Sequence, residues 1–173
     1  VVLKNAMALS TSAATIQVGG ALDLNGNSIS NAITLNGSGI GSDGALINSS
    51  STGATVGTLT VGFGHGSGGI GGSIGGSGNI TSTGPLTGNN ILVKSGSGTL
   101  TVGNDAGNAI SSTRNGLIRI DAGILRMSNS SSALGVSTSA VILNGGTLSL
   151  GSATTSVAYP ISVTSDSSLI SDV

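Results

Sequence analysis

Few residues of this chain could do chemistry, and their spacing does not by itself assemble a site. The 173-residue sequence has no Cys, one His and six acidic residues, all of them Asp. Glycan-cleaving enzymes use paired carboxylates as acid and base, or a basic side chain as the base. Only the stacking of distant segments could pair the carboxylates, which belong to Asp23, Asp43, Asp105, Asp121, Asp166 and Asp172.

One group of charged residues clusters in the sequence, around Asp121. Arg119 and Arg126 flank it, and Arg114 lies shortly before them. If these segments are strands, alternation points the neighbouring aliphatic side chains inward and both flanking Arg side chains outward. A surface ion pair, which adds little stability, explains this arrangement and is the interpretation we favour. The alternative is an exposed, ligand-facing patch made of Arg114, Arg119, Asp121 and Arg126.

A Gly-rich stretch contains the single His of the chain. The run Gly64-His-Gly-Ser-Gly-Gly69 fits the phosphate-turn pattern Gly-x-Gly-x-x-Gly. No helix is expected after it, and no acidic residue follows about 20 positions later, so nucleotide binding is not predicted. His65 also lacks a nearby Cys, Glu or second His that could complete a metal site. We therefore expect a solvated loop histidine, no cofactor, no metal and no enzymatic activity.

The composition argues against an ordinary globular core. Gly supplies 31 residues, there is one Phe, one Tyr and no Trp, and charged residues make up 6% of the chain. The remaining apolar residues are mainly Ala, Val, Leu and Ile, which stack well in identical layers. A mean hydropathy of +0.39 separates the chain from disordered segments, which combine low hydrophobicity with high charge. These features predict a narrow, repetitive core.

Charge and hydropathy also limit the partners and the setting. The net charge of −1 comes without a basic stripe, so nucleic acid is not an expected partner. No apolar run approaches the roughly 20 residues that span a bilayer, so this segment is not expected to insert into a membrane. Repeat phrases begin close to residue 1, which is Val. We expect residues 1–173 to form one continuous segment of a longer repeat array.

A short phrase, Gly-x-Φ-x-Φ with Φ aliphatic, recurs along the chain. The hexapeptide Gly-Thr-Leu-Thr-Val-Gly occurs at 57–62 and again at 98–103. Recurring strand-sized units of this kind indicate a solenoid. Side-chain alternation predicts strands at 14–18, 21–24, 32–35, 45–47, 58–61, 79–81, 91–93, 99–102, 117–120, 124–127, 140–143, 147–150 and 161–163.

The corners between these strands leave two all-β arrangements open. Pairs such as Asn25-Gly26 and Asn144-Gly145 suit sharp solenoid corners, but they could equally close hairpins of an antiparallel meander. A duplicated stretch favours the solenoid, because stacked coils can be appended without remaking a closed core. The residues Ile16, Gly19, Gly20, Leu22 and Leu24 align with Ile142, Gly145, Gly146, Leu148 and Leu150. Coils of roughly 20 residues, stacked about 4.8 Å apart, would give eight or nine coils over about 40 Å.

The Gly-rich segment 63–78 is the least strand-like part of the sequence. It could be a flexible loop that leaves the solenoid. It could also be a thin part of the coil in which Ile70 and Ile74 still point inward. We favour the thin coil, because only Gly and Ser separate these residues before the chain reaches Ile80.

The order of the phrases in the second half resembles a known repeat. A Lys-x-Gly-x-Gly-Thr-Leu strand begins at Lys94, a spacer and a strand pair follow up to Met127, and then come Ala133-Leu-Gly and Asn144-Gly-Gly-Thr-Leu. This order resembles the autotransporter-associated β-strand repeat of bacterial passenger domains. The upstream segments at 20–26 and 33–37 look like the stretch between two such repeats, so the resemblance covers most of the chain. The spacer 104–113 departs from the wording usual in that family.

The resemblance implies a right-handed parallel β-helix with no helices of consequence, exported by a Gram-negative bacterium and displayed on its surface or shed. It implies a scaffold without catalytic residues, and an extended rod or fibre formed with further copies by end-to-end stacking. An adhesin that binds host or surface glycans is the alternative, and a polysaccharide lyase or hydrolase is a remote one. Sugar binding generally uses exposed aromatic rings, for which only Phe63 and Tyr159 are available, so the scaffold is favoured.

Overall fold

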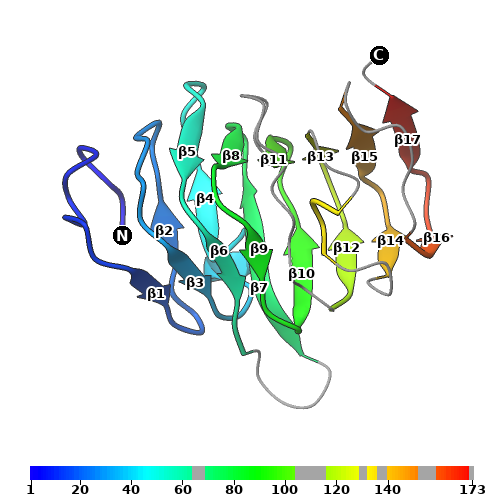
Figure 1. Cartoon of the computed structure of the whole chain (residues 1–173), viewed down its shortest axis with the longest axis horizontal. Coiled ribbons are helices and arrows are strands. Elements are labelled where there is room, and N and C mark those ends of the chain that lie inside the picture. Colours follow the sequence, from blue (N-terminus) through cyan, green and yellow to red (C-terminus); the bar gives the residue numbers. More distant parts are fainter. Residues whose placement is uncertain (64–68, 104–115, 129–131, 136–139, 152–158, 172–173) are drawn as a thin grey trace.

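The computed structural model is an all-β chain whose parallel strands stack into a β-solenoid of about six turns (Figure 1). The structure describes residues 1–63, 69–103, 116–128, 132–135, 140–151 and 159–171. Within these residues no α-helix occurs, and one 3-10 turn, η1 (Ile40–Ser42), interrupts the strands. The prediction of an all-β parallel solenoid is confirmed, and the antiparallel meander is excluded because every strand pair is parallel.

Three sheets run along the solenoid, and we call them the first, second and third sheet. The first sheet has the spatial order β16 (Ile161–Val163), β14 (Val141–Leu143), β12 (Ile118–Ile120), β10 (Ile91–Lys94), β7 (Ile70–Gly76), β4 (Leu46–Asn48) and β2 (Leu22–Asp23). The second has β17 (Ser168–Ser171), β15 (Thr147–Leu150), β13 (Ile124–Met127), β11 (Thr99–Val102), β8 (Ile80–Ser82) and β5 (Ala54–Val56). The third has β1 (Ala14–Ile16), β3 (Ile33–Leu35), β6 (Leu59–Val61) and β9 (Leu86–Thr87).

Each full coil passes from the first sheet to the second, then to the third, and back to the first. The path β4, β5, β6, β7 shows one such coil. The register between coils gives their length, which ranges from 20 residues between Ile74 and Lys94 to 28 residues between Leu46 and Ile74. Three strands and three corners need more chain than the roughly 20 residues assumed from the sequence. The expectation of eight or nine coils is therefore wrong, and about six turns are present.

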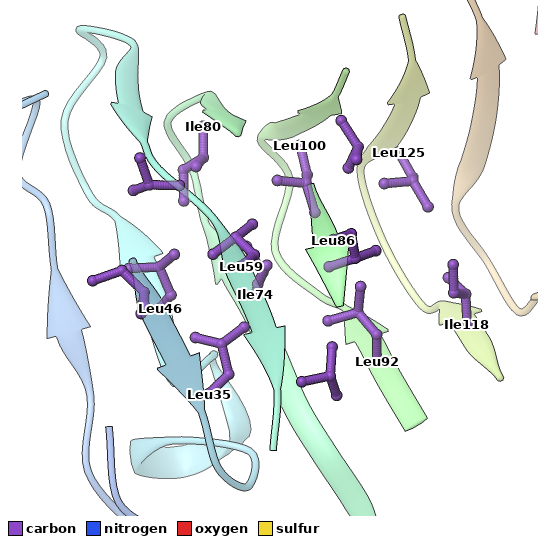
Figure 2. Close-up of a cluster of buried hydrophobic side chains, with 14 of the residues drawn as sticks. Leu35, Leu46, Leu59, Ile74, Ile80, Leu86, Leu92, Leu100, Ile118 and Leu125 are labelled. Carbon is purple, nitrogen blue, oxygen red and sulfur yellow. The ribbon is translucent and has the colours of Figure 1, made fainter. Parts of the chain in front are cut away.

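The core is a set of aliphatic columns along the solenoid axis. In the second sheet, Ile80, Leu100, Leu125 and Leu148 occupy successive strands in register, and each is at most 1% exposed. Figure 2 shows Ile80, Leu100 and Leu125 beside side chains of the other sheets, all turned into the same interior. Burial of one such side chain contributes about 1.5–3 kcal/mol. The stack of identical layers therefore replaces the aromatic core that the composition lacks.

Four strands went unrecognised in the sequence, namely β5, β7, β9 and β17. The clearest is β7, which lies inside the Gly-rich segment 63–78 and pairs with β4 and β10. Ile74 is 1% exposed and Ile70 is partly buried. Gly is poorly represented in strands, but here a Cβ at Gly72 would lie 2.6 Å from that of Leu35, so only Gly fits. Residues 64–68 of this segment, with His65, lie outside the described residues.

The duplicated stretch does not mark equivalent positions in the coil. Leu22 lies on β2 in the first sheet, whereas its aligned counterpart Leu148 lies on β15 in the second sheet. Ile16 of β1 lies in the third sheet, and the aligned Ile142 lies on β14 in the first. The similarity therefore repeats a local strand–corner–strand unit, which can occupy any side of the solenoid.

The two ends of the solenoid differ. At the N-terminal end, residues 1–3 add to the edge of the first sheet, where Leu3 N donates to Asp23 O at 2.8 Å. The turn that follows is held by Asn31, whose Nδ2 donates to Ser10 O at 3.1 Å and to Ser12 O at 2.6 Å. At the C-terminal end, β16 and β17 have a neighbouring strand on one side only (Figure 1).

Candidate functional site

Arg119 and Asp121 form the ion pair that the sequence favoured. Arg119 lies on β12 and faces outward between the buried Ile118 and Ile120. Its Nε donates to Asp121 Oδ1 and its Nη2 to Asp121 Oδ2, both at 2.7 Å. The two side chains are 35% and 27% exposed, so the pair lies at the surface. This two-point geometry confirms the ion-pair interpretation.

Asp121 also begins a polar ladder along the corner between the first and second sheets. Asn144 Nδ2 donates to Asp121 Oδ1 at 2.9 Å, and Thr164 Oγ1 bonds Asn144 Oδ1 at 3.1 Å. Partial burial alone would raise the pKa of Asp121, but hydrogen bonds from Arg119 and Asn144 and the charge of Arg119 hold that pKa below its usual value. The carboxylate therefore stays ionised near neutral pH and is unsuited to act as a general acid.

The other members of the predicted patch are not brought to this pair as one surface. Arg126 lies on β13 of the second sheet, next to Thr101 and Ser149, whereas Arg119 belongs to the first sheet. Both guanidinium groups point outward, but from different sheets. Arg114 lies outside the described residues. The described part of the predicted patch thus reduces to the pair Arg119–Asp121, with Arg126 beyond the corner.

Asp23 is a corner-stabilising group. It is 8% exposed, and its carboxylate accepts hydrogen bonds from Asn25 N at 2.9 Å and from Ser49 Oγ at 2.6 Å. Burial opposes ionisation of Asp23, but these hydrogen bonds outweigh it and lower its pKa. Within the residues described, no group of three or more His, Cys, Asp or Glu side chains could hold a metal ion.

Lys94 is a buried cation that the sequence analysis did not identify. Its side chain points inward at the end of β10 and is 2% exposed. Its Nζ donates to Ser95 O at 2.6 Å, to Gly96 O at 2.8 Å and to Ala122 O at 3.3 Å. Ser95 and Gly96 form the corner of one coil, and Ala122 belongs to the corner of the next. Lys94 therefore ties two successive corners together from inside.

The surroundings of Lys94 shift its titration. No acidic group of the described residues pairs with it. Burial lowers the pKa of Lys94 to about 8. Three carbonyl acceptors favour the ammonium form, so Lys94 remains largely charged at neutral pH.

The aromatic residues have separate roles. Tyr159 is 7% exposed and its hydroxyl donates to Gly135 O at 3.0 Å, so it belongs to the core and cannot stack on a ligand. The expectation that Tyr159 is available for sugar binding is therefore wrong. Phe63 is 82% exposed and borders a groove of about 610 Å³ on the outer surface of the third sheet. The sequence analysis noted Phe63 but not the groove, since the groove forms from several coils.

A comparison with family models, with curated proteins and with solved structures finds no match to this chain. The resemblance to passenger-domain repeats therefore stays a prediction from the phrases themselves. A search of the described residues for membrane-spanning helices finds none with the necessary length and apolarity.

Proposed function

We propose that the chain is a structural segment of an exported bacterial surface protein, in which the solenoid serves as a stiff, extended rod. The supporting observation is the continuity of the core from coil to coil. Leu100, Leu125 and Leu148 stand on successive strands of the second sheet and are each 0% exposed. A core of this kind is as long as the rod and is closed by each added coil.

Stiffness follows from the way each coil is held by its neighbours. Strand β10 pairs with β7 on one side and with β12 on the other, and both pairings are parallel. Opening an inner coil therefore breaks two ladders and exposes two layers of the core, whereas an end coil has one ladder to lose. Resistance to local opening suits a protein part whose task is to keep its length.

Display on, or release from, the surface of a Gram-negative bacterium is the second part of the proposal. It is supported by the order of the repeat phrases, which resembles passenger-domain repeats. An antibody raised against the purified chain should label intact cells of the source organism as strongly as permeabilised ones, or should detect the protein in the medium. Labelling confined to permeabilised cells would contradict the proposed location.

End-to-end stacking of copies is the third part. Val163 and Leu169 occupy inward positions of the C-terminal coil, yet they are 64% and 53% exposed because no further coil covers them. Unpaired strand edges of this kind pair with other chains. Sedimentation velocity should show species that grow with concentration, and Leu169→Lys should suppress them.

The matched control for this experiment is Ile40→Lys. Ile40 is 64% exposed but lies in η1, away from the C-terminal edge. It should leave the association unchanged. A single monomeric species at every concentration, or equal suppression by both substitutions, would count against stacking through the C-terminal coil.

Glycan binding is a second candidate function, and one observation favours it. The ring of Phe63 is 82% exposed at the border of a groove, although burial of a Phe ring contributes about 1.5–3 kcal/mol. An exposed ring beside polar groups is the arrangement that sugar binding uses. A glycan array probed with the whole chain tests this candidate, and an array without any bound glycan would overturn it.

A further inference from the structure

The groove beside Phe63 crosses several coils on the outer surface of the third sheet. Its volume of about 610 Å³ is within the roughly 300–1,000 Å³ range of small-molecule sites. Thr15 of β1, Thr34 of β3 and Thr60 of β6 line it, together with Asn89 after β9. Because these strands belong to successive coils, the groove extends along the solenoid axis.

A row of threonine side chains follows this axis. Thr15 pairs in register with Thr34, Thr34 with Thr60, and Thr60 with Thr87. Side-chain alternation places these residues outward, between the buried aliphatic residues of each strand. Parallel strands lie about 4.8 Å apart, so the hydroxyl groups repeat at about that spacing. The oxygens Thr60 Oγ1 and Thr87 Oγ1 lie 2.8 Å apart and hydrogen-bond to each other.

The backbone of Phe63 is fixed, although its ring is exposed. Phe63 N donates to Asn36 Oδ1 at 2.9 Å, and Asn36 Nδ2 donates to Ile16 O at 2.9 Å. Asn36 is 8% exposed, so this connection is shielded from water. Gly62 is required beside it, because a Cβ there would collide with Asn36 Oδ1. The ring is therefore presented from a position tied to β3 and β1.

Polar but uncharged groups complete the lining. Asn90 Nδ2 donates to Gly62 O at 2.7 Å and holds the floor of the groove, while the neighbouring Asn89 is exposed. None of the described lining residues carries a charge. Hydroxyl and amide groups both donate and accept hydrogen bonds, as sugar hydroxyl groups do. An anionic ligand would find no cation among these lining residues.

We propose that this groove binds a linear, neutral oligosaccharide, with one sugar ring packed on Phe63 and its hydroxyl groups hydrogen-bonded to the threonine row and Asn89. The apolar face of a pyranose ring matches the aromatic ring, and its equatorial hydroxyl groups match the polar row. This inference rests on the glycan-binding candidate and does not depend on the scaffold role.

The test is a titration of the whole, isotope-labelled chain, followed by NMR amide shifts. The probes are cellohexaose, maltohexaose and N-acetylchitohexaose as neutral oligosaccharides, and hexagalacturonate as an acidic one. At least one neutral probe should shift the amides of Thr34, Thr60 and Phe63. The acidic probe should bind at least tenfold more weakly.

Two substitutions should weaken binding of the neutral probe. Phe63→Ala removes the stacking surface and should raise Kd at least tenfold, and Thr34→Val removes one hydroxyl group with little change of shape and should raise Kd about threefold. Their matched controls are Ile40→Ala, an exposed apolar residue outside the groove, and Thr81→Val, an outward threonine of the second sheet. Both controls should leave Kd unchanged, and equal thermal midpoints will show that all variants are folded.

The outcomes separate the site from the wider candidate function. Binding of a neutral probe that persists unchanged in Phe63→Ala, or shifts confined to other sheets, would overturn this site and leave the glycan-binding candidate standing. Preferential binding of hexagalacturonate would overturn the neutral specificity. Failure of all four probes, together with an empty glycan array, would overturn both the site and the candidate function.

Discussion

At the scale of single residues, Lys94 gives a physical reason for the Lys-x-Gly-x-Gly phrase. The side chain turns into the core, where its ammonium group meets Gly96 O at 2.8 Å and Ala122 O at 3.3 Å. A Cβ at Gly123 would come within 2.9 Å of Lys94 Nζ, so the facing position must stay small. The phrase therefore describes a buried amine and the glycine corner that accepts it.

Lys94 makes the stability depend on pH in a defined window. Its pKa is about 8 in the folded chain and 10.5 when the side chain is solvated, so between these values the unfolded state binds more protons. Stability should therefore rise with pH across this window, and be independent of Lys94 below about pH 8. From pH 8 to 10 the gain relative to Lys94→Met should be about 2 kcal/mol.

Urea denaturation of both proteins at several pH values measures this gain. The comparison with Lys94→Met removes the contributions of all other titrating groups, such as Tyr159, whose pKa is raised by burial. Parallel stability curves for the two proteins between pH 8 and 10 would show that Lys94 does not titrate as its burial requires.

At the scale of elements, the corners decide how closely coils can stack. Gly96 has φ +69°, and a Cβ there would collide with the backbone oxygen of Gly76 in the preceding coil. Gly53, by contrast, meets nothing within 4 Å and needs no positive φ. Both glycines are followed by short strands of the second sheet, so the sequence does not distinguish them.

Replacement of these two glycines should have different effects. Gly96→Ala should lower the free energy of unfolding by about 2–4 kcal/mol, because it combines backbone strain with a collision between coils. Gly53→Ala should change it by no more than about 0.5 kcal/mol, or stabilise slightly by restricting the unfolded chain. The shift of the urea midpoint measures both. Similar shifts would mean that the corner at Gly96 relaxes freely.

At the scale of the whole molecule, the value of a core residue depends on its place along the rod. Leu100 and Leu169 belong to the same inward column, connected in register through Leu125 and Leu148. Leu100 is 0% exposed in a middle coil, whereas Leu169 is 53% exposed in the last one. Inner coils lose contacts on two sides when a side chain is truncated, and the end coil on one.

Truncation of the two leucines should reflect this difference. Leu100→Ala should cost about 3 kcal/mol, as for a fully buried leucine that leaves a cavity. Leu169→Ala should cost less than about 1 kcal/mol. Chemical denaturation of the dilute chain, below the concentration at which it associates, gives both values. Equal costs would indicate that the C-terminal coil is covered in solution, as stacking of copies would produce.

The part of this protein that the sequence predicts well is local. Alternation correctly placed Ile118 and Ile120 inward and Arg119 outward, because the direction of a strand side chain depends only on its neighbours in the chain. The same argument anticipated the pair Arg119–Asp121, whose members are two positions apart. Corners were found for a similar reason, since positive φ at residues such as Gly26 and Gly145 is a local preference.

Register between coils was decided only in the tertiary structure. The aligned leucines Leu22 and Leu148 lie in different sheets, and the Gly-rich strand β7 exists because β4 and β10 pair with it. The burial of Lys94 and the groove beside Phe63 also depend on which corner and which strand come to lie in the neighbouring coil. Coils differ in length from 20 to 28 residues, so these neighbours cannot be counted off along the chain. Side-chain direction is a property of one strand, whereas a site on a solenoid is a property of the stack.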